Sequence, residues 1–293
     1  MPSVSIIIPT LNADVNFCKL LDALGSQTLK AKEILIIASN YNDGTAELAK
    51  SHGCKITQIN KHDFDHGTTR NLGVVQTNSE FVIFLTQDAI PADKYTIAEL
   101  IKPLQDDSKI AICYGRQLSE PNAHPIERFW REFNYPAQSA LKAKKDIPTL
   151  GLRAFFCSNC CSAIRHSAFD KLGGFKNNVI VNEDMLYAAK AISAGYAVYY
   201  AADAKVYHSH SYSLFEICKR YFKIGRFFAD NQWFLQHVAL NHYGGEMLKA
   251  GVKTFWQKRA PHYIPCFLLE LAVKAITCKI GWYYQLLLHK KRI

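Results

Sequence analysis

The sequence lacks several features that would each place it in a familiar class of protein. No stretch of about 18 uncharged apolar residues occurs, so we expect no membrane-spanning helix. The opening "MPSVSIIIPTLN" has no basic segment before its apolar run, so we expect no secretory signal. No G-x-G-x-x-G follows the first predicted strand, and G-x-x-x-x-G-K-[ST] is absent, which removes the main support for a dehydrogenase or a P-loop enzyme.

The nine cysteines do not form the pattern of a disulfide framework. They are odd in number and scattered through a chain without an export signal, which predicts reduced thiols in the cytoplasm. Cys157, Cys160 and Cys161 include one C-x-x-C, but no second pair and no paired histidine motif follows. We therefore expect buried thiols there rather than a structural zinc site.

The 293 residues, 49% of them hydrophobic, suffice for one large domain or two joined halves.

Positive charge is concentrated at one end of the chain. Residues 1–203 carry 21 basic and 21 acidic side chains, whereas residues 204–293 carry 14 and 4. The C-terminal third should therefore meet a membrane surface, a phosphate-bearing substrate or nucleic acid. No nucleic-acid-binding motif accompanies the basic residues, so we expect no nucleic-acid partner.

Short β-rich runs alternate with helical stretches in the first half, which predicts an α/β fold with a mainly parallel sheet. A helix opened by acidic residues is expected over 182–196, ending near Gly195, and the chain after His210 reads as helical. The other strands expected are 4–9, 33–39, 55–59 and 81–86, and the helices are 16–27 and 43–53, the second capped by Asp43 and closed by Gly53.

Polar residues follow the ends of the predicted strands. Thr10 and Asn12 come after the first strand, Ser39 after the second and Asp88 after the fourth. Ligands of such sheets bind outside the carboxyl ends of the strands. A carboxylate such as Asp88 can be solvated there or hold a cation, whereas burying it inside the sheet would be costly.

A set of short motifs makes the chain resemble a known family. "SIIIPTLN", "DGT", "TRNLG", "FLTQDA", "GGF" and "NEDM" occur in the order and spacing of the family 2 inverting glycosyltransferases, over residues 3–226. "FDHGTTRN", "TQDA", "HSHSYS" and "KRYFKIG" resemble the bacterial rhamnosyltransferase branch, which uses dTDP-L-rhamnose to build O-antigen and related polysaccharides. The resemblance implies a GT-A fold, a single Rossmann-like mixed sheet flanked by helices, with a helical C-terminal extension.

The resemblance also implies an organisation and a reaction. Residues 1–115 would form the nucleotide-sugar-binding half, residues 116–213 the acceptor-binding half, and residues 214–293 a helical, basic extension. L-Rhamnose would pass from dTDP-L-rhamnose to a lipid-linked glycan at the cytoplasmic face of the inner membrane. A same-fold transferase using UDP-galactose or UDP-glucose is an alternative. A non-catalytic sugar-nucleotide-binding module is another, and the retention of Asp88 and of the pair Glu183–Asp184 argues against it.

The resemblance assigns a divalent cation, Mg²⁺ or Mn²⁺, to Asp88. This residue matches the last acid of the family's D-x-D motif, whose first acid is replaced by Thr86. One carboxylate, waters and substrate phosphates suffice for Mg²⁺. His208 and His210, on one face if they lie in a strand, would add a further ligand, and imidazole suits Mn²⁺ better. A solvated loop acid and a structural histidine are the alternatives.

Glu183 and Asp184 match the family's acid pair at a helix start. Inverting transfer needs a base that takes the proton from the acceptor hydroxyl. The resemblance favours Asp184 as the base and Glu183 as a neighbour that orients the acceptor. Acidic residues are also common in any first helical turn, which is the alternative.

The donor-binding residues that the resemblance implies come from five parts of the chain. Arg70 would fork onto a phosphate or support the base pocket, and pairing with Asp65 is the alternative. Ala38 stands where many relatives carry the aspartate that receives the base, so the backbone, Ser39 or Asn40 would read the base instead. The full set is Pro9, Thr10, Asn12, Ser39, Asp65, His66, Arg70, Gln87, Asp88 and Arg220.

The C-terminal third holds two basic features. Lys219, Arg220, Lys223 and Arg226 fall near one helical face, which is either solvated or bound to the donor diphosphate or a lipid-linked acceptor. Residues 262–293 are too charged to span a bilayer, and they fit a helix in the interface of an anionic membrane, with Trp282 and Tyr283 at headgroup level. The alternative is a helix that packs on the domain or on a second copy of the chain, in a homo-oligomer.

Overall fold

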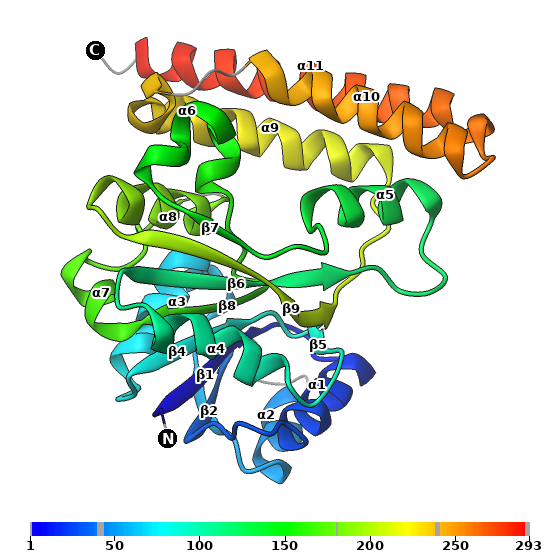
Figure 1. The fold of residues 1–293 in the computed structure, drawn as a ribbon. Helices are drawn as coiled ribbons and strands as arrows, with labels where there is room; N and C mark the ends of the chain where they lie inside the picture. Colours follow the sequence, from blue (N-terminus) through cyan, green and yellow to red (C-terminus); the bar gives the residue numbers. More distant parts are fainter. Residues whose placement is uncertain (1, 40–43, 180, 238–240, 291–293) are drawn as a thin grey trace.

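One curled mixed sheet runs through the centre of the molecule, as a computed structural model of residues 2–39, 44–179, 181–237 and 241–290 shows (Figure 1). Neighbouring strands follow the order β3-β2-β1-β4-β8-β6-β9-β5, with β7 also paired to β9. The strands are β1 (Val4–Thr10), β2 (Glu33–Ala38), β3 (Lys55–Gln58), β4 (Phe81–Leu85), β5 (Ile90–Pro91), β6 (Ile110–Leu118), β7 (Ala140–Lys142), β8 (Cys161–Arg165) and β9 (Ala197–Tyr207).

The pairing directions bring the carboxyl ends of the parallel strands to one edge. Strands β1 to β4 are parallel to one another where they pair, as predicted. Strand β8 runs antiparallel between β4 and β6, and β9 is parallel to β6. The carboxyl ends of β1, β2, β4, β6 and β9 therefore point the same way. The mixed α/β sheet is confirmed, with an antiparallel strand that the sequence pattern did not predict.

Helices cover both faces of the sheet because its central strands are apolar on both sides. Ile6 and Ile8 of β1 pack against one layer, and Ile7 packs against the other, as the two-residue period of a strand requires. The first layer contains α1 (Val15–Gly25), α2 (Thr45–Ser51) and α4 (Thr96–Asp106), and the second contains α3 (His66–Val75), α7 (His166–Lys171) and α8 (Glu183–Ser193).

Glycines mark the ends of two helices as predicted, and one predicted cap lies outside the described residues. Helix α2 begins at Thr45, after Gly44 at φ 77°, and Gly44 has no side chain to cap the helix. Asp43, the predicted cap, lies outside the described residues. Gly53, at φ 72°, follows the end of α2 as predicted. Helix α8 begins at Glu183 and ends before Gly195, also as predicted.

The C-terminal part is helical, as predicted, and forms a separate layer above the sheet (Figure 1). Helix α11 packs along α9 so closely that a Cβ at Gly225 would lie 1.9 Å from the Cys278 carbonyl oxygen. The remaining helices are α5 (Pro125–Asn134), α6 (Ile147–Leu150), α9 (Leu214–Asp230), α10 (Asn241–Gln257) and α11 (Ile264–Lys290), with 3₁₀ turns at Lys61–Asp63, Lys144–Asp146, Gly151–Phe155, Gln232–His237 and Pro261–Tyr263.

Two expectations about membranes and thiols can be compared with this fold. Across residues 2–39, 44–179, 181–237 and 241–290, no helix combines the length and apolarity that a membrane crossing needs. All nine cysteines are free thiols, and Cys157, Cys160 and Cys161 are buried, as expected.

Candidate active site

A carboxylate and two imidazoles meet where β4 and β9 end. The antiparallel pairing of Ile90 with Tyr207 brings the residues before β5 beside those after β9. The Nε2 atoms of His208 and His210 lie 3.4 and 3.2 Å from Oδ2 of Asp88, and 2.8 Å from each other. The two histidines lie just beyond the strand rather than on it, and both still face Asp88.

A second layer of polar contacts fixes the two histidines. Oε1 of Gln117 receives a hydrogen bond from Arg131, which can only donate, so the Nδ1–H of His208 donates to the same oxygen at 2.9 Å. Nε2 of His208 is thereby turned toward Asp88. The carboxylate of Glu127 accepts from the backbone N–H of His210 at 2.9 Å and from the hydroxyls of Ser209 and Ser211.

A bulge between β6 and β9 places Gln117 for this role. The register of the pair shifts after Gly115, so that Gln117 lies opposite Val206 and close to His208. A Cβ on Gly115 would lie 2.5 Å from the carbonyl oxygen of Ala204, so only glycine allows this approach. We missed Gln117 in the sequence, although its position at the carboxyl end of a strand is the signal that identified Asp88.

The charges within this group favour a cation. Burial raises the pKa of Asp88, but the hydrogen bond and charge of His208 outweigh it and hold that pKa well below its usual range. Burial opposes protonation of His208, yet Cys160 and Asp88 together raise its pKa to about 9. Burial and the charge of His208 lower the pKa of His210. The three ligand atoms lie within 4.8 Å of one another and can hold a divalent ion.

The acid pair opens α8, where Asn182 takes a left-handed φ of 61°. Glu183 is buried, and its Oε1 accepts from Nη1 of Arg70 and from Nδ2 of Asn159, each at 3.2 Å. The alternative pairing of Arg70 with Asp65 is wrong, because Asp65 caps α3 and accepts from the backbone N–H and hydroxyl of Thr68. Glu183 is therefore held as one half of a buried ion pair.

Asp184 is half-buried and differs from its neighbour. Its two carboxylate oxygens accept from the backbone N–H groups of Asn159 at 3.0 Å and of Met185 at 2.7 Å. Burial and the negative charge of Glu183 raise its pKa to about 7, against the opposing effect of those hydrogen bonds and of Arg70. A carboxylate with a pKa near neutrality is suited to act as a general base.

We call Asp88, His208 and His210 the cation group. Two residues join the acid pair to this cation group. Asn159 contacts both acids, and the carbonyl of Cys160 accepts from the backbone N–H of Thr86 at 3.2 Å. Thr86 lies two residues before Asp88, so the two groups lie on either side of residues 159–160. Asn159 was missed in the sequence, where its place before a strand gave no separate signal.

The loop after β1 is held by one of the predicted donor-binding residues. Oε1 of Gln87 accepts from the backbone N–H of Leu11 at 2.8 Å, and Nε2 donates to its carbonyl at 3.1 Å. Both ends of this amide are thus engaged. Pro9 and Thr10 belong to β1, with Thr10 buried, and Asn12 turns the chain at φ 51°. Gln87 therefore positions the loop that carries Asn12.

Among the residues that the structure describes, Ser39 and Arg70 each carry a buried polar atom without a hydrogen-bond partner. Within the described ranges, neither Oγ of Ser39 nor Nε of Arg70 has a hydrogen-bond partner. Leaving such groups unpaired is costly unless a ligand or water meets them. Ser39 follows β2, and Arg70 shares Nη1 between Glu183 and the carbonyl of His66 at 3.0 Å, while the ring of His66 is exposed.

The basic residues of α9, Lys219, Arg220, Lys223 and Arg226, do not all have the same surroundings. The guanidinium of Arg220 lies over the ring of Tyr212, 5.7 Å from its centroid, and its charge contributes to lowering the pKa of His210. It is exposed near the cation group. Arg226 instead donates from Nε to Oε1 of Gln285 on α11 at 2.8 Å. Of the four basic residues of α9 considered in the sequence, Arg226 is therefore engaged with α11, whereas Arg220 lies near the cation group.

Comparisons with known proteins bear on this arrangement. The family model described as "Glycosyl transferase family 2" matches residues 5–173. The O-antigen chain rhamnosyltransferase RfbN of Salmonella typhimurium is 40% identical over 287 residues, covering 96% of this chain and 90% of that protein. The O-antigen chain rhamnosyltransferase WbaN of Salmonella anatum is 38% identical, covering 97% and 91%.

A solved structure shares the fold at low identity. The mannosyltransferase from Pyrobaculum calidifontis, in complex with GDP-Man and Mn²⁺, superimposes with a TM-score of 0.63 at 16% identity. The match covers 94% of this chain and 87% of that one. The similarity extends through the helical C-terminal part as well as the sheet.

Proposed function

Because this chain belongs to glycosyltransferase family 2, we propose that it transfers L-rhamnose, with inversion, from dTDP-L-rhamnose to a lipid-linked glycan in O-antigen or related polysaccharide synthesis. The chain is a glycosyltransferase with the GT-A fold. The observation that carries the proposed chemistry is the placement of the cation group and the near-neutral Asp184 on either side of residues 159–160. The identity to two O-antigen rhamnosyltransferases supports the sugar.

The cation group fits a six-coordinate divalent ion. Bonds of about 2.0–2.1 Å place neighbouring ligand atoms about 3 Å apart, close to the 2.8–3.4 Å between the three atoms here. Two imidazoles beside one carboxylate favour Mn²⁺ over Mg²⁺. When bound, the ion would neutralise charge on the departing diphosphate. Asp88, His208 and His210 would hold it, and exposed Arg220 would add a further positive charge.

Asp184 is the residue that takes the acceptor proton in this proposal. Its pKa near 7 leaves a large fraction deprotonated at neutral pH. The N–H groups of Asn159 and Met185 hold the carboxylate in place without removing its basicity. Glu183 is held by Arg70 and Asn159, so its role is to fix the start of α8 and the orientation of its neighbour.

The donor would lie along the carboxyl edge of the sheet. Asn12, on the loop held by Gln87, and Ser39, whose hydroxyl is free among the described residues, would contact the nucleoside. Arg70 and His66, at the start of α3, would line the sugar side next to the acids, with Asp65 as the cap that holds them. Asn40, an alternative reader of the base, lies outside the described residues.

The donor assignment is tested by measuring turnover with a panel of nucleotide sugars. We expect dTDP-L-rhamnose to be the productive donor, and dTDP-sugars to bind better than GDP-sugars in calorimetry with Mn²⁺ present. Turnover with UDP-galactose and none with dTDP-L-rhamnose would reject the rhamnose assignment and favour a same-fold transferase with another donor. Binding of several donors without transfer to any acceptor would favour a binding module.

The division of labour within the fold remains a proposal. The expected boundary after residue 115 lies inside β6, so the nucleotide-sugar half (1–115) and the acceptor half (116–213) share one sheet. The extension expected from residue 214 begins with α9. We assign the nucleotide to the first half and the acceptor and the base Asp184 to the second, and the cation to ligands from both, Asp88 from the first half and His208 and His210 from the second.

The C-terminal helices offer a surface for an anionic membrane, where a lipid-linked acceptor would be anchored. Trp282 packs toward the domain core, contrary to the headgroup position expected for it. The opposite side of α11 carries an exposed apolar stripe, spaced as one helix face requires: Leu269, Ile276, Ile280, Tyr283 and Leu287. Exposed Lys279 and Lys290 accompany the stripe. We propose peripheral attachment at the cytoplasmic face of the inner membrane through this surface.

Paired glutamates on the stripe should detach the protein from vesicles. For Ile276→Glu/Ile280→Glu we expect the affinity for phosphatidylglycerol-containing vesicles to fall by about tenfold or more, because two apolar side chains that the bilayer would bury are lost. Co-sedimentation measures this. Val75→Glu/Tyr95→Glu changes two exposed apolar residues away from the C-terminal helices and serves as the control. Unchanged vesicle binding with an altered oligomeric state would make the stripe a subunit interface instead.

A further inference from the structure

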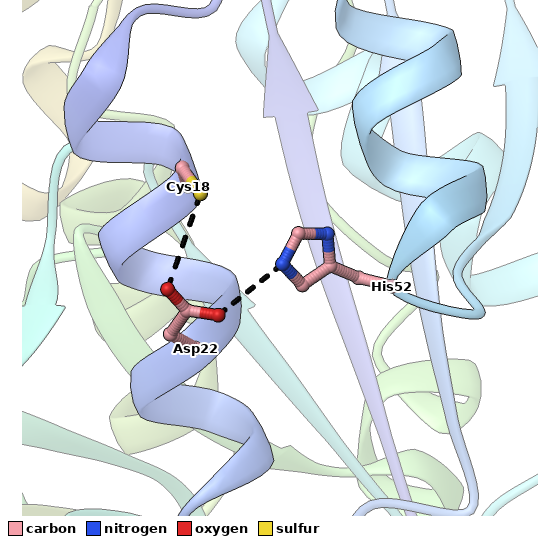
Figure 2. A group of neighbouring side chains, drawn as sticks. All are labelled: Cys18, Asp22 and His52. Atoms are coloured by element: carbon pink, nitrogen blue, oxygen red, sulfur yellow. Dashed lines mark hydrogen bonds and ion pairs between the residues drawn. The ribbon is translucent and has the colours of Figure 1, made fainter.

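A second group of metal-ligand side chains lies between α1 and α2, apart from the site described above. Cys18 and Asp22 are one turn apart on α1, and His52 directly follows α2 (Figure 2). Sγ of Cys18 lies 3.9 Å from Oδ2 of Asp22, and Nε2 of His52 lies 3.3 Å from Oδ1. We propose that these three side chains bind a zinc ion that clips α1 to α2.

The spacing of the ligand atoms fits tetrahedral zinc. Bonds of about 2.3 Å to sulfur and about 2.0–2.1 Å to nitrogen or oxygen place neighbouring ligand atoms about 3.3–3.6 Å apart. Nε2 of His52 lies in that range from Oδ1 of Asp22, whereas Sγ of Cys18 lies 3.9 Å from the other carboxylate oxygen, Oδ2, so the exposed Asp22 side chain must rotate to bring one oxygen near both. All three ligand atoms lie within 4.8 Å of one another.

His52 is oriented for metal binding by its other ring nitrogen. Nδ1 lies 2.9 Å from the carbonyl oxygen of Leu48, which can only accept a hydrogen bond. The proton of the neutral ring is therefore on Nδ1, and the lone pair on Nε2 faces Asp22 (Figure 2). A hydrogen bond of this kind from the second nitrogen is the usual companion of a zinc-bound histidine.

The remaining requirements are met by the two helices. Cys18 and Asp22 are four residues apart and share a side of α1, whose start is capped by Asp14 through the backbone N–H of Asn16 at 2.9 Å. A thiolate and a carboxylate balance the charge of Zn²⁺. Binding converts the thiol of Cys18 to a thiolate and releases one proton to solvent. The partial exposure of the cluster leaves a fourth position for water.

A zinc clip would join two neighbouring units of the fold. Helices α1 and α2 follow β1 and β2, and the segments before them already touch, since the backbone N–H of Ala13 donates to Oγ1 of Thr45 at 3.2 Å. An ion bound by both helices would add a second contact between them, near the C-terminal end of α2. This role is structural and does not depend on the glycosyl-transfer proposal.

Cobalt tests the site because a cobalt–thiolate bond gives a charge-transfer absorption that oxygen and nitrogen ligands do not. We expect the reduced, metal-stripped full-length protein to develop this band within two equivalents of Co²⁺, because the Asp88 group also takes one ion, and we expect zinc to displace the band. Cys18→Ser should abolish the band. His52→Ala should weaken cobalt binding about tenfold or more, because a ligand is lost.

Two other cysteine variants are the controls. Cys218→Ser changes a partly buried thiol elsewhere, and Cys160→Ser changes the thiol beside the Asp88 group. Both should retain the band. A band that persists in Cys18→Ser, one that disappears in Cys160→Ser, or the absence of any band in the parent would overturn the proposal. Circular dichroism without metal checks that Cys18→Ser is folded.

Discussion

Asp184→Asn is expected to lower turnover at least a hundredfold and leave donor affinity nearly unchanged. General-base catalysis is typically worth about 10²–10⁴ in rate, and an amide cannot take the acceptor proton. Donor affinity should hold because the proposed function assigns Asp184 to the acceptor rather than to the donor diphosphate. Single-turnover rates at saturating donor, with calorimetric donor binding alongside, separate the two effects.

The substitution also has a structural cost that must be measured. Both carboxylate oxygens accept backbone N–H groups, from Asn159 and Met185. The NH₂ of an asparagine cannot accept, so one of these donors loses its partner, at a cost of about 1–3 kcal/mol. Urea unfolding of the variant shows whether it is folded under assay conditions. Asp184→Glu keeps the base but displaces it, and it should retain part of the activity.

The pH profile gives an independent readout of the same residue. A base must be deprotonated to work, and burial beside Glu183 raises the pKa of Asp184 to about 7. The parent kcat/KM should therefore rise with pH up to about 7 and level off above it, falling about tenfold per pH unit on the acid side. The residual activity of Asp184→Asn should lack this rise. A parent profile that is flat between pH 5 and 8 would assign the base elsewhere.

Glu183→Gln is the matched comparison because its effect should differ in kind. Removing this charge leaves the guanidinium of Arg70 buried without its carboxylate, which typically costs about 3–5 kcal/mol of stability. We expect lower stability in urea and a smaller loss of activity per folded molecule than in Asp184→Asn. If Glu183→Gln is inactive and Asp184→Asn retains activity, the two roles are exchanged.

Asp88→Ala is expected to abolish stimulation by Mn²⁺ and reduce turnover by a factor on the order of 10³. Losing a ligand that holds a cation against the leaving diphosphate should cost several kcal/mol of transition-state stabilisation, and each 1.36 kcal/mol is about tenfold in rate. The fold should survive because the side chain is one-third exposed at a strand end. Rates across an Mn²⁺ titration, and Mn²⁺ binding followed by electron paramagnetic resonance, provide the measurement.

Neighbouring variants show whether the cation group acts as a unit. His208→Ala and His210→Ala should each weaken Mn²⁺ binding, because both Nε2 atoms reach Oδ2 of Asp88. Asp93→Ala removes an exposed acid just after β5, which accepts from the backbone N–H of Tyr95, and it should behave as the parent. Full activity and an unchanged Mn²⁺ dependence in Asp88→Ala would remove the cation from this position.

The sequence by itself determined the features that depend on neighbours along the chain. Apolar runs of strand length gave β1 to β4 within a residue of their ends, and acids before a helical stretch marked Glu183 at the first position of α8. Asp88 was identified because a polar residue directly after a buried strand must face the edge where ligands bind. These signals are local, so no knowledge of the pairing of distant strands was needed.

Only the tertiary structure decided which of these residues meet. The partner of Arg70 is Glu183, 113 positions away, rather than nearby Asp65, and the choice depends on how α3 and α8 pack on the sheet. The bulge after Gly115 and the register of β5 with β9 bring Gln117 and Asp88 to His208. Such contacts depend on strand register and helix packing, in which a shift of one residue redirects every side chain, and single-chain patterns do not encode that register.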